Sequence, residues 1–186
     1  IITGLVGSEM CIRDRSYVIR LKTPLDKEIL FEDPLQGKMV FHTREVDDTV
    51  LLKSDGFPTY HLAVVIDDHL MGVTHAFRGV EWIPSTPKHV LLYEAFGWER
   101  PEIVHLPVIL DPDGGKLSKR KGTVSARAFL EEGYTVDALL NFLMLIGWSA
   151  PIEREHGEKE REFFSLAEFV DMFDINGLNK SSGTFN

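Results

Sequence analysis

A strand–helix–strand pattern in residues 73–110 constrains the fold of this chain more than any other feature of its sequence. An apolar segment at 73–77 precedes a helical segment that begins near Ser85 and ends at Gly97, and a second apolar segment follows at 103–110. Proline close to the first helical position and glycine just after the last one are typical helix boundaries. Such a unit connects two parallel strands, normally with a right-handed crossover. The pattern therefore predicts an α/β fold that contains a parallel sheet.

The segments on either side of this unit have their own patterns. Upstream, short apolar runs alternate with turn residues, which favours short β-strands. Pro58 suits a first helical position and predicts a helix at 59–71. Downstream, Thr135 is a good helix cap, and Ser165 with Glu168 has the pattern of a capping box. The predicted strands lie at 17–21, 29–31, 39–41 and 50–52, and the predicted downstream helices lie at 126–132, 135–145 and 165–173.

A basic loop follows the second strand of the central unit. The sequence KLSKR at 116–120 lies between DPDGG at 111–115 and Gly122, and five cations fall within residues 116–127. Glycines on both sides place these cations on a turn between two regular elements. Such a loop is suited to phosphate, and a solvated run of surface lysines is the simpler alternative. Ligands of parallel sheets bind beyond the carboxyl ends of the strands, so we expect Arg78 and this loop at the same edge.

Composition limits the classes of protein and partner. The chain has 186 residues, of which 44% are hydrophobic and 26% charged, and this is ordinary for a soluble globular protein with one substantial core. The formal net charge of −9 argues against a surface that binds nucleic acid everywhere, so contacts with RNA phosphate must come from a local patch. The single cysteine, Cys11, excludes an internal disulfide and fits a reducing compartment. No apolar stretch approaches the roughly twenty residues needed to cross a bilayer.

The two ends of the chain differ from its middle. Residues 1–16 contain the string GSEMCIRDRS, which resembles translated cloning or sequencing linker. We therefore expect residues 1–16 to be a non-native tail and leave them out of the fold prediction. At the other end, Asn186 follows the last predicted helix without a folded stop. These features predict a chain that is truncated at both ends.

Three segments carry a family resemblance. The KLSKR loop is similar to the KMSKS signature of class I aminoacyl-tRNA synthetases. The stretches SDGFPTYHLAVVIDDHLMGVTHAFRGVEW and STPKHVLLYEAFGWE resemble the glutamyl-tRNA synthetase family in order and in spacing. The resemblance runs from about Tyr17 to the end of the chain. Two departures are visible: a His-x-Gly-His type tetrapeptide, the other class I signature, is absent, and Val80 stands where relatives often carry an acidic residue.

The resemblance implies the second half of a Rossmann-like, parallel-sheet nucleotide-binding domain, with short β-strands before it and a helical junction after it. Residues 17–52 would be the end of the inserted acceptor-stem-binding subdomain, 53–124 the second half of the class I catalytic domain including the KLSKR loop, and 125–186 the start of a helical stem-contact junction. The implied activity is ATP-dependent ligation of glutamate to tRNA through a glutamyl-adenylate, as part of a larger enzyme, and we expect the fragment alone to be inactive. The alternatives are a glutaminyl-tRNA synthetase, a relative that charges both tRNAs, and a non-enzymatic tRNA-binding module.

The same resemblance implies roles for the residues of the basic loop. Lys116 and Lys119 would be catalytic and would bind ATP, because ammonium groups stabilise the negative charge that grows on the phosphorane and on the leaving pyrophosphate. Ser118 would add a hydroxyl donor to the ATP site. Arg120 and Lys121 would face the tRNA backbone, where they add affinity without base specificity. ATP would enter together with Mg²⁺.

Arg78 is expected to bind the side-chain carboxylate of glutamate, since a planar guanidinium offers two parallel hydrogen bonds to a carboxylate. The alternative is a structural ion pair between Arg78 and either Glu81 or Asp68. Tyr60 is expected to line the glutamate pocket, with a half-buried helix tyrosine as the alternative. Trp82 is expected to contact tRNA.

The acidic and histidine side chains around the first predicted helix do not predict a fixed metal site. Asp67, Asp68, His69 and His75 lack the spacing of converging ligands. His61 is expected to be a pocket-wall or core histidine rather than a general base. The expected partners are glutamate tRNA, glutamate and ATP, with no membrane, and the oligomeric state stays open. The expected compartment is the cytoplasm, with an organelle as the alternative.

Overall fold

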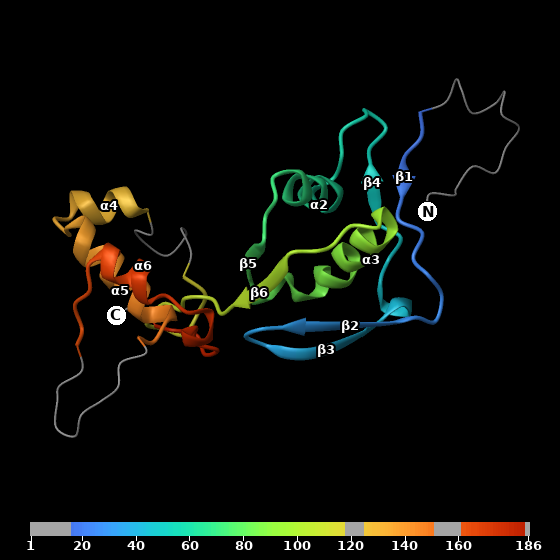
Figure 1. Ribbon diagram of the computed structural model, residues 1–186. Helices are drawn as coiled ribbons and strands as arrows, with labels where there is room; N and C mark the ends of the chain where they lie inside the picture. Colours follow the sequence, from blue (N-terminus) through green and yellow to red (C-terminus); the bar gives the residue numbers. More distant parts are fainter. Residues whose placement is uncertain (1–15, 118–124, 151–160, 185–186) are drawn as a thin grey trace, which may run out of the picture. The chain divides into compact units, whose positions relative to one another are not determined.

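The computed structural model describes residues 16–117, 125–150 and 161–184. These residues divide into two compact units (Figure 1). The first, here called the sheet unit, comprises the described residues up to Asp33 together with Gly37–Val104. The second, here called the helical unit, comprises Pro34–Gln36 and the described residues from His105 onward. The predicted tail at 1–16 lies outside the described residues except for Ser16.

Short antiparallel strands form the first part of the sheet unit. β1 (Ile19–Arg20) pairs with β4 (Val50–Leu52), and β2 (Glu28–Asp33) pairs with β3 (Gly37–His42) through six register pairs from Glu28–His42 to Asp33–Gly37. A 3₁₀ turn, η1 (Thr43–Glu45), follows β3. In β2, alternate side chains are buried and exposed, as a sheet with one solvated face requires. The prediction of short strands in this region is confirmed.

The first helix, α2 (Tyr60–Leu70), begins later than the sequence predicts. Pro58 is not its first residue, because residues 57–59 are extended and pair with the end of β4: Lys53 N donates to Phe57 O at 2.9 Å and Thr59 N donates to Leu51 O at 2.8 Å. Thr59 is the N-cap, and its hydroxyl donates to Val50 O instead of capping the helix. Pairing with β4 therefore outweighs the helical preference of a proline at N1.

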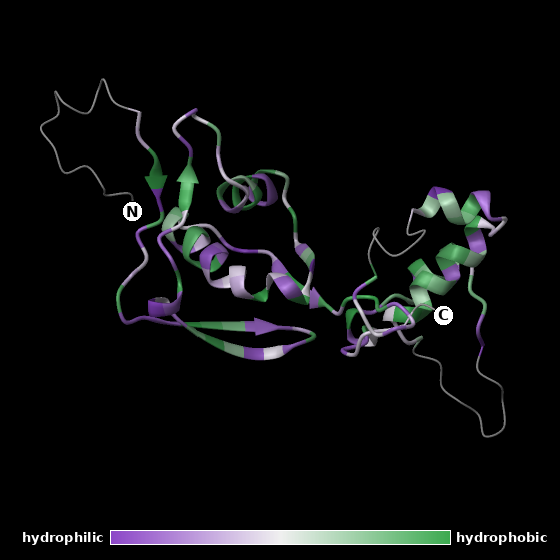
Figure 2. Ribbon diagram, turned by 180° about the vertical axis from the view of Figure 1, so that it is seen from behind, coloured by the Kyte–Doolittle hydropathy of each residue, from purple (hydrophilic) through white to green (hydrophobic). Residues whose placement is uncertain are grey.

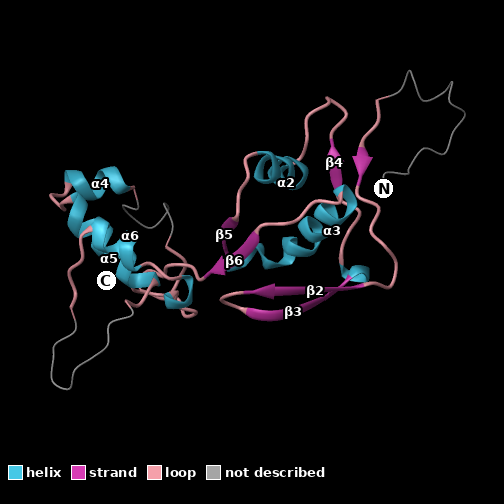
Figure 3. Ribbon diagram, in the orientation of Figure 1, coloured by secondary structure: helices cyan, strands magenta, loops and turns pink. Residues whose placement is uncertain are grey.

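The central strand–helix–strand unit is present. β5 (His75–Gly79) and β6 (Glu102–Leu106) form a parallel pair, and the 3₁₀ turn η2 (Val80–Ser85) and helix α3 (Thr86–Phe96) connect them (Figure 3). Gly97 adopts the left-handed conformation (φ 67°) that ends α3, as predicted. The second strand is shorter than the predicted 103–110 segment. It ends before Pro107, which lacks the N–H that a continuing ladder needs.

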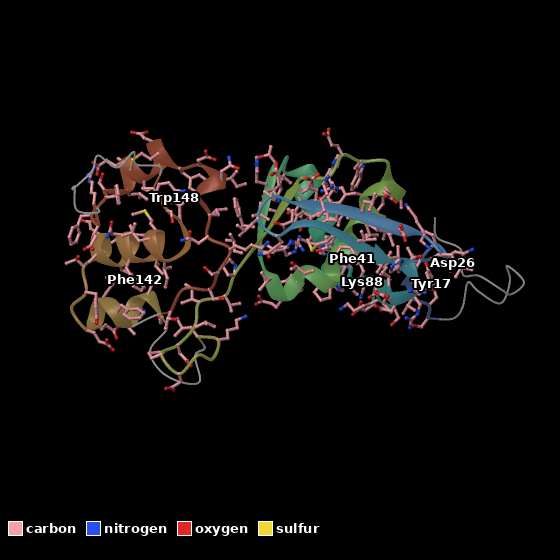
Figure 4. All side chains as sticks on the ribbon, turned by 90° about the horizontal axis from the view of Figure 1, so that it is seen from below. Tyr17, Asp26, Phe41, Lys88, Phe142 and Trp148 are labelled. Atoms are coloured by element: carbon pink, nitrogen blue, oxygen red, sulfur yellow. The ribbon has the colours of Figure 1, made fainter. Side chains whose placement is uncertain are left out.

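Helix α3 supplies the centre of the hydrophobic core in the sheet unit. The run from His89 to Tyr93 is buried without interruption, so this helix is covered on several sides and not only on one face. Val65 of α2, Ile103 of β6 and the inward-facing side chains of β2 pack in the same cluster. Lys88 on α3 lies at the edge of this core, where its Nζ is 2.6 Å from Asp47 Oδ1 (Figure 4).

The helical unit contains α4 (Ala126–Glu131), α5 (Val136–Gly147), α6 (Leu166–Met172) and the 3₁₀ turn η3 (Ile175–Gly177). α5 is drawn mostly in the hydrophobic colour in Figure 2. Both predicted caps are confirmed: Thr135 accepts from Ala138 N, and Ser165 with Glu168 forms the complete capping box.

Trp148 anchors the interior of the helical unit. Its side chain is buried, its ring meets the Phe169 ring edge-on with centroids 4.9 Å apart, and its Nε1 donates to Asp174 O at 3.0 Å (Figure 4). A buried indole with its N–H satisfied combines a large apolar contact with no unpaired donor. This residue therefore links the end of α5 to α6 and η3.

Candidate functional site

Arg78 lies near the end of β5, and only 10% of its side chain is exposed. Its guanidinium has two partners in the sheet unit. Nη1 is 3.0 Å from Nδ1 of His89 on α3, and Nη2 is 3.6 Å from Oδ2 of Asp68 on α2. Contacts to two different helices restrain the plane of the guanidinium. Of the two structural ion pairs considered for this residue, the one with Asp68 is present.

A row of two histidines continues from Arg78 toward the start of α2. His89 is 1% exposed, and its Nε2 lies 3.0 Å from Nδ1 of His61. Burial is the main cause that lowers the pKa of His61, and the positive charges of Lys88 and Arg78 lower it further. These causes favour the neutral imidazole of His61 over its charged form.

Tyr60 and Trp82 form an aromatic pair beside these histidines. Their ring centroids are 5.2 Å apart at an interplanar angle of 43°, and the Tyr60 ring also meets His61 and His89 edge-on at 5.6 and 6.4 Å. Tyr60 is 49% exposed and Trp82 is 40% exposed, so both side chains are partly open to solvent. α2 and η2 each contribute one ring, and the pair forms an open wall next to the buried Arg78.

In the helical unit, a tight hairpin leads into the basic loop. Leu110 and Lys116 form an antiparallel bridge, and Leu117 N donates to Ile109 O at 2.9 Å. Asp111, which is 5% exposed, closes the turn by accepting from Gly115 N at 2.8 Å through Oδ1. Gly114 has φ 83°, a conformation that favours glycine. The hairpin therefore fixes the backbone of Lys116 at the entrance of the basic loop.

The predicted site residues fall into three groups. Tyr60, Trp82 and Arg78 share one neighbourhood in the sheet unit, where Tyr60 approaches His89 and His89 contacts Arg78. Lys116 lies in the hairpin of the helical unit. The remaining predicted residues of the basic loop lie outside the described residues; they are Ser118, Lys119, Arg120 and Lys121. A joint edge for Arg78 and the basic loop therefore stays a prediction.

Sequence reasoning did not assign three residues that organise these places. His89 links Arg78 to His61, Asp68 holds Arg78 in the ion pair that the sequence offers only as the alternative to substrate binding, and Asp111 closes the hairpin. The signal for His89 is a polar side chain inside the apolar run HVLLY of a helix, because a buried polar group needs a hydrogen-bond partner. The residues next to His89 in the sequence do not reveal which side chain is its partner.

Within residues 16–117, 125–150 and 161–184, no group of three or more His, Cys, Asp or Glu side chains is arranged to hold a metal ion. No helix in this part of the chain is both long enough and apolar enough to span a membrane.

Comparison with known proteins identifies the family of this chain. The model of the family described as tRNA synthetases class I (E and Q), catalytic domain, matches residues 8–186. The chain is 54% identical over 170 residues to a glutamate–tRNA ligase from Finegoldia magna, and 51% identical over 171 residues to one from Alkaliphilus metalliredigens. These alignments cover 91% and 92% of this chain but 33% of each relative, so the chain spans about a third of the length of these proteins.

Solved structures agree with this relationship. The crystal structure of a glutamate tRNA ligase from Elizabethkingia meningosepticum in complex with its amino acid matches with a TM-score of 0.84 and 40% identity, over 96% of this chain and 38% of the other. The structure of glutamate-tRNA synthetase from Elizabethkingia anophelis matches with a TM-score of 0.83 and the same identity. The predicted Rossmann-like α/β fold class is thus confirmed. The chain belongs to the family of class I tRNA synthetases for glutamate and glutamine, and it lies in the catalytic domain.

Proposed function

We propose that this chain is part of an enzyme that joins glutamate to its tRNA in two steps, with ATP consumed in the first. The observation that carries the proposal is the buried Arg78 at the end of β5, held on two sides and next to the Tyr60–Trp82 pair. A guanidinium in a partly dry pocket selects a carboxylate by its charge and by its planar geometry. The relatives that match most of the chain are glutamate–tRNA ligases, which supports glutamate over glutamine.

In the proposed reaction, the α-carboxylate of glutamate attacks the α-phosphate of ATP, and pyrophosphate leaves. Arg78 binds the side-chain carboxylate and thereby orients the other end of the amino acid, while the Tyr60 ring forms a wall of the pocket. Lys116 and Lys119 stabilise the negative charge that develops on the phosphates. The acyl group then passes to the terminal adenosine of tRNA, whose backbone contacts Arg120, Lys121 and Trp82.

ATP enters this reaction as its Mg²⁺ complex, so the metal arrives with the substrate. Residues 17–186 contain no cysteine, which fits a protein from a reducing compartment, and we propose the cytoplasm. The 53–124 segment supplies the catalytic part of this enzyme, 17–52 the end of the acceptor-stem subdomain and 125–186 the start of the stem-contact junction.

Glutamate-dependent exchange of pyrophosphate into ATP tests the proposal in an enzyme of the relatives' full length that carries this segment. Arg78→Ala is expected to cost about 2–5 kcal/mol in kcat/KM for glutamate, because it leaves the substrate carboxylate unpaired. The KM for ATP should stay near the wild-type value. An unchanged kcat/KM for glutamate would remove Arg78 from the pocket.

Lys119→Ala should affect the rate of the reaction and not glutamate binding, in contrast to Arg78→Ala in the same assay. It should lower the rate of adenylate formation by roughly 10²–10³ while glutamate binding stays intact, the loss expected for one donor to a developing oxyanion. A Lys119→Ala variant as fast as the wild type would favour the surface-lysine alternative, and a wild type without exchange activity would favour the non-enzymatic tRNA-binding module.

A further inference from the structure

His89 occupies the centre of a buried row of polar groups. It is 1% exposed, lies on α3 within the core, and contacts Arg78 through Nδ1 and His61 through Nε2, both at 3.0 Å. A histidine that is only a core residue needs a partner for its polar nitrogens, but it does not need one of them to be the candidate substrate-binding arginine. The position of His89 therefore suggests an effect on Arg78.

The chemistry of the partners fixes the protons along this row. An arginine side chain only donates hydrogen bonds, so Nδ1 of His89 must accept from Arg78 Nη1. The proton of a neutral His89 is then on Nε2, which donates to Nδ1 of His61. His61 in turn carries its own proton on Nε2. A lowered pKa of His61 agrees with this arrangement, because its Nδ1 must stay without a proton.

We propose that His89 is a positioning residue that holds the Arg78 guanidinium in its substrate-binding orientation, and that His61 fixes the tautomer of His89 that makes this possible. This inference rests on the proposed role of Arg78 in binding glutamate. His89 restrains Nη1 from α3, and Asp68 restrains Nη2 from α2. Each terminal nitrogen carries two hydrogens, so one N–H on each remains for the two oxygens of a carboxylate.

The neutral charge of His89 is part of this argument. A second carboxylate on Arg78, in place of the imidazole, would offset the positive charge that attracts the substrate. An imidazole acceptor positions the guanidinium without adding a negative charge beside the incoming carboxylate. Arg78 therefore has one anionic partner, Asp68 at 3.6 Å, and one neutral partner, His89 at 3.0 Å. These two contacts orient the guanidinium, and its positive charge still attracts an anion.

Two substitutions separate the contacts of His89. In His89→Asn, the amide oxygen takes the place of Nδ1 and still accepts from Arg78. In His89→Gln, the amide group takes the place of Nε2, so the contact with His61 is kept and the acceptor for Arg78 is lost. Both variants remove the ring and place an amide in the same buried site. Their difference therefore reports on the Arg78 contact and not on the loss of packing.

Pyrophosphate exchange in the full-length enzyme provides the measurement. His89→Gln should raise the KM for glutamate by about 10- to 100-fold, the value of a hydrogen bond to a charged group, with kcat and the KM for ATP near wild type. His89→Asn should restore the KM to within about threefold of wild type. In an Arg78→Lys background, His89→Gln should add little further loss, since its target is already gone. His42→Gln, at an exposed histidine on β3, is the matched control and should change nothing.

Equal losses in the Asn and Gln variants, or losses shared between kcat and the KM for ATP, would overturn the positioning role and leave His89 as a packing residue. The tautomer offers a test that does not depend on activity: ¹H–¹⁵N spectra of the enzyme with labelled histidine should show His89 protonated on Nε2. A proton on Nδ1 would contradict the inference even in an active enzyme. A wild-type enzyme without glutamate-dependent exchange would instead refute the proposed function, and the spectrum would still report on the contact.

Discussion

At the scale of single residues, Tyr93 carries a buried hydroxyl whose oxygen has no hydrogen-bond partner among the described residues. The side chain is 2% exposed, and burial, with a smaller contribution from Asp68, raises the pKa of Tyr93 to about 12. Removal of an unsatisfied buried hydroxyl costs no hydrogen bond and relieves its desolvation. Tyr93→Phe is therefore expected to leave the free energy of unfolding unchanged or to raise it by up to about 1 kcal/mol.

Urea unfolding of the two proteins measures this difference. Tyr134→Phe, at an exposed tyrosine of the helical unit, is the control for the loss of a solvated hydroxyl. A loss of more than about 1 kcal/mol in Tyr93→Phe alone would mean that the hydroxyl has a partner after all, for example a buried water.

His61 makes stability depend on pH. Its folded pKa lies below the ordinary value of 6.5, first because of burial and then because of Lys88 and Arg78, while Asp47 opposes them. The unfolded chain thus binds a proton more readily, so this part of the stability is complete above pH 6.5 and is lost as the pH falls through the lower folded pKa. Protonation of Nδ1 would also break the hydrogen bond from His89.

His61→Asn keeps an acceptor near the position of Nδ1 and cannot titrate. Thermal unfolding from about pH 7.5 to about pH 5 should therefore lose less stability in this variant than in the wild type. His42→Asn, at an exposed position away from the Arg78–His89–His61 row, controls for the replacement of a histidine by asparagine and should follow the wild type. Parallel curves for all three proteins would show that His61 has no perturbed pKa.

The residues of the site differ in how well a single sequence predicts them. Tyr60 and Arg78 lie at element ends, and the resemblance alone predicts both of them as glutamate-binding residues. His89 could not be assigned in this way, because its partners come from α2 and β5, and only the packing of α3 against them brings the three side chains together. Its place in an apolar segment predicts that His89 has a hydrogen-bond partner, but it does not predict which residue that partner is.

At the scale of elements, the hairpin before the basic loop depends on Asp111. Its carboxylate accepts the N–H of Gly115, and the loss of this acceptor leaves a part-buried donor unpaired, at a cost of about 1–3 kcal/mol. Asp111→Ala should therefore open the hairpin locally, and the amide of Leu117, which donates to Ile109 O, should exchange with solvent about 10- to 100-fold faster.

Asp111→Asn keeps the oxygen that accepts from Gly115 and should exchange at nearly the wild-type rate. The amide of Trp98, which donates to Tyr93 O at the end of α3, is the internal reference in the other unit. Faster exchange at both amides would point to global unfolding instead of a local role for Asp111.

Helices and strands were predictable where the residues that begin or end an element agree with its pattern of apolar side chains. Gly97, Thr135 and Ser165 mark helix ends in the sequence and in the structure alike. Pro58 misled the prediction because pairing of residues 57–59 with β4 is a contact that no local rule anticipates. Pro107 did carry a usable signal, since a proline without an N–H marks the place where β6 stops.

At the scale of the whole molecule, a net charge of −9 coexists with a cluster of five cations in residues 116–127. If Arg120 and Lys121 contact tRNA phosphates, as proposed, their replacement by alanine should weaken binding in proportion to the ions released. The slope of log K against log salt should become shallower by about 1 to 2 for the double variant.

Titrations of the full-length enzyme with tRNA over a range of salt concentrations supply these slopes. A Lys53→Ala variant, at an exposed cation of the sheet unit outside the 17–52 segment, removes one such charge elsewhere. An equal change in slope per charge removed would mean that tRNA responds to the overall charge and not to the basic loop.

The fold class followed from the strand–helix–strand pattern, since few arrangements satisfy two apolar strands joined by a capped helix. The sequence did not predict the division into two units. The boundary falls within β6, and no stretch of linker-like composition marks it. That boundary depends on contacts between distant residues, which no window of a single sequence contains.

The hairpin that carries Lys116 is also bonded on its other side, where Leu110 N donates to Gly183 O and Leu110 bridges Thr184 in parallel. Helices α4, α5 and α6 all lie between these partners in the chain, so the entropy of closing a long loop opposes the contact until they have folded. During synthesis, the basic loop leaves the ribosome well before Gly183 does. The hairpin at 109–117 would then be among the last parts of the helical unit to reach its final backbone, and an enzyme with an incomplete helical unit would lack an ordered support for Lys116.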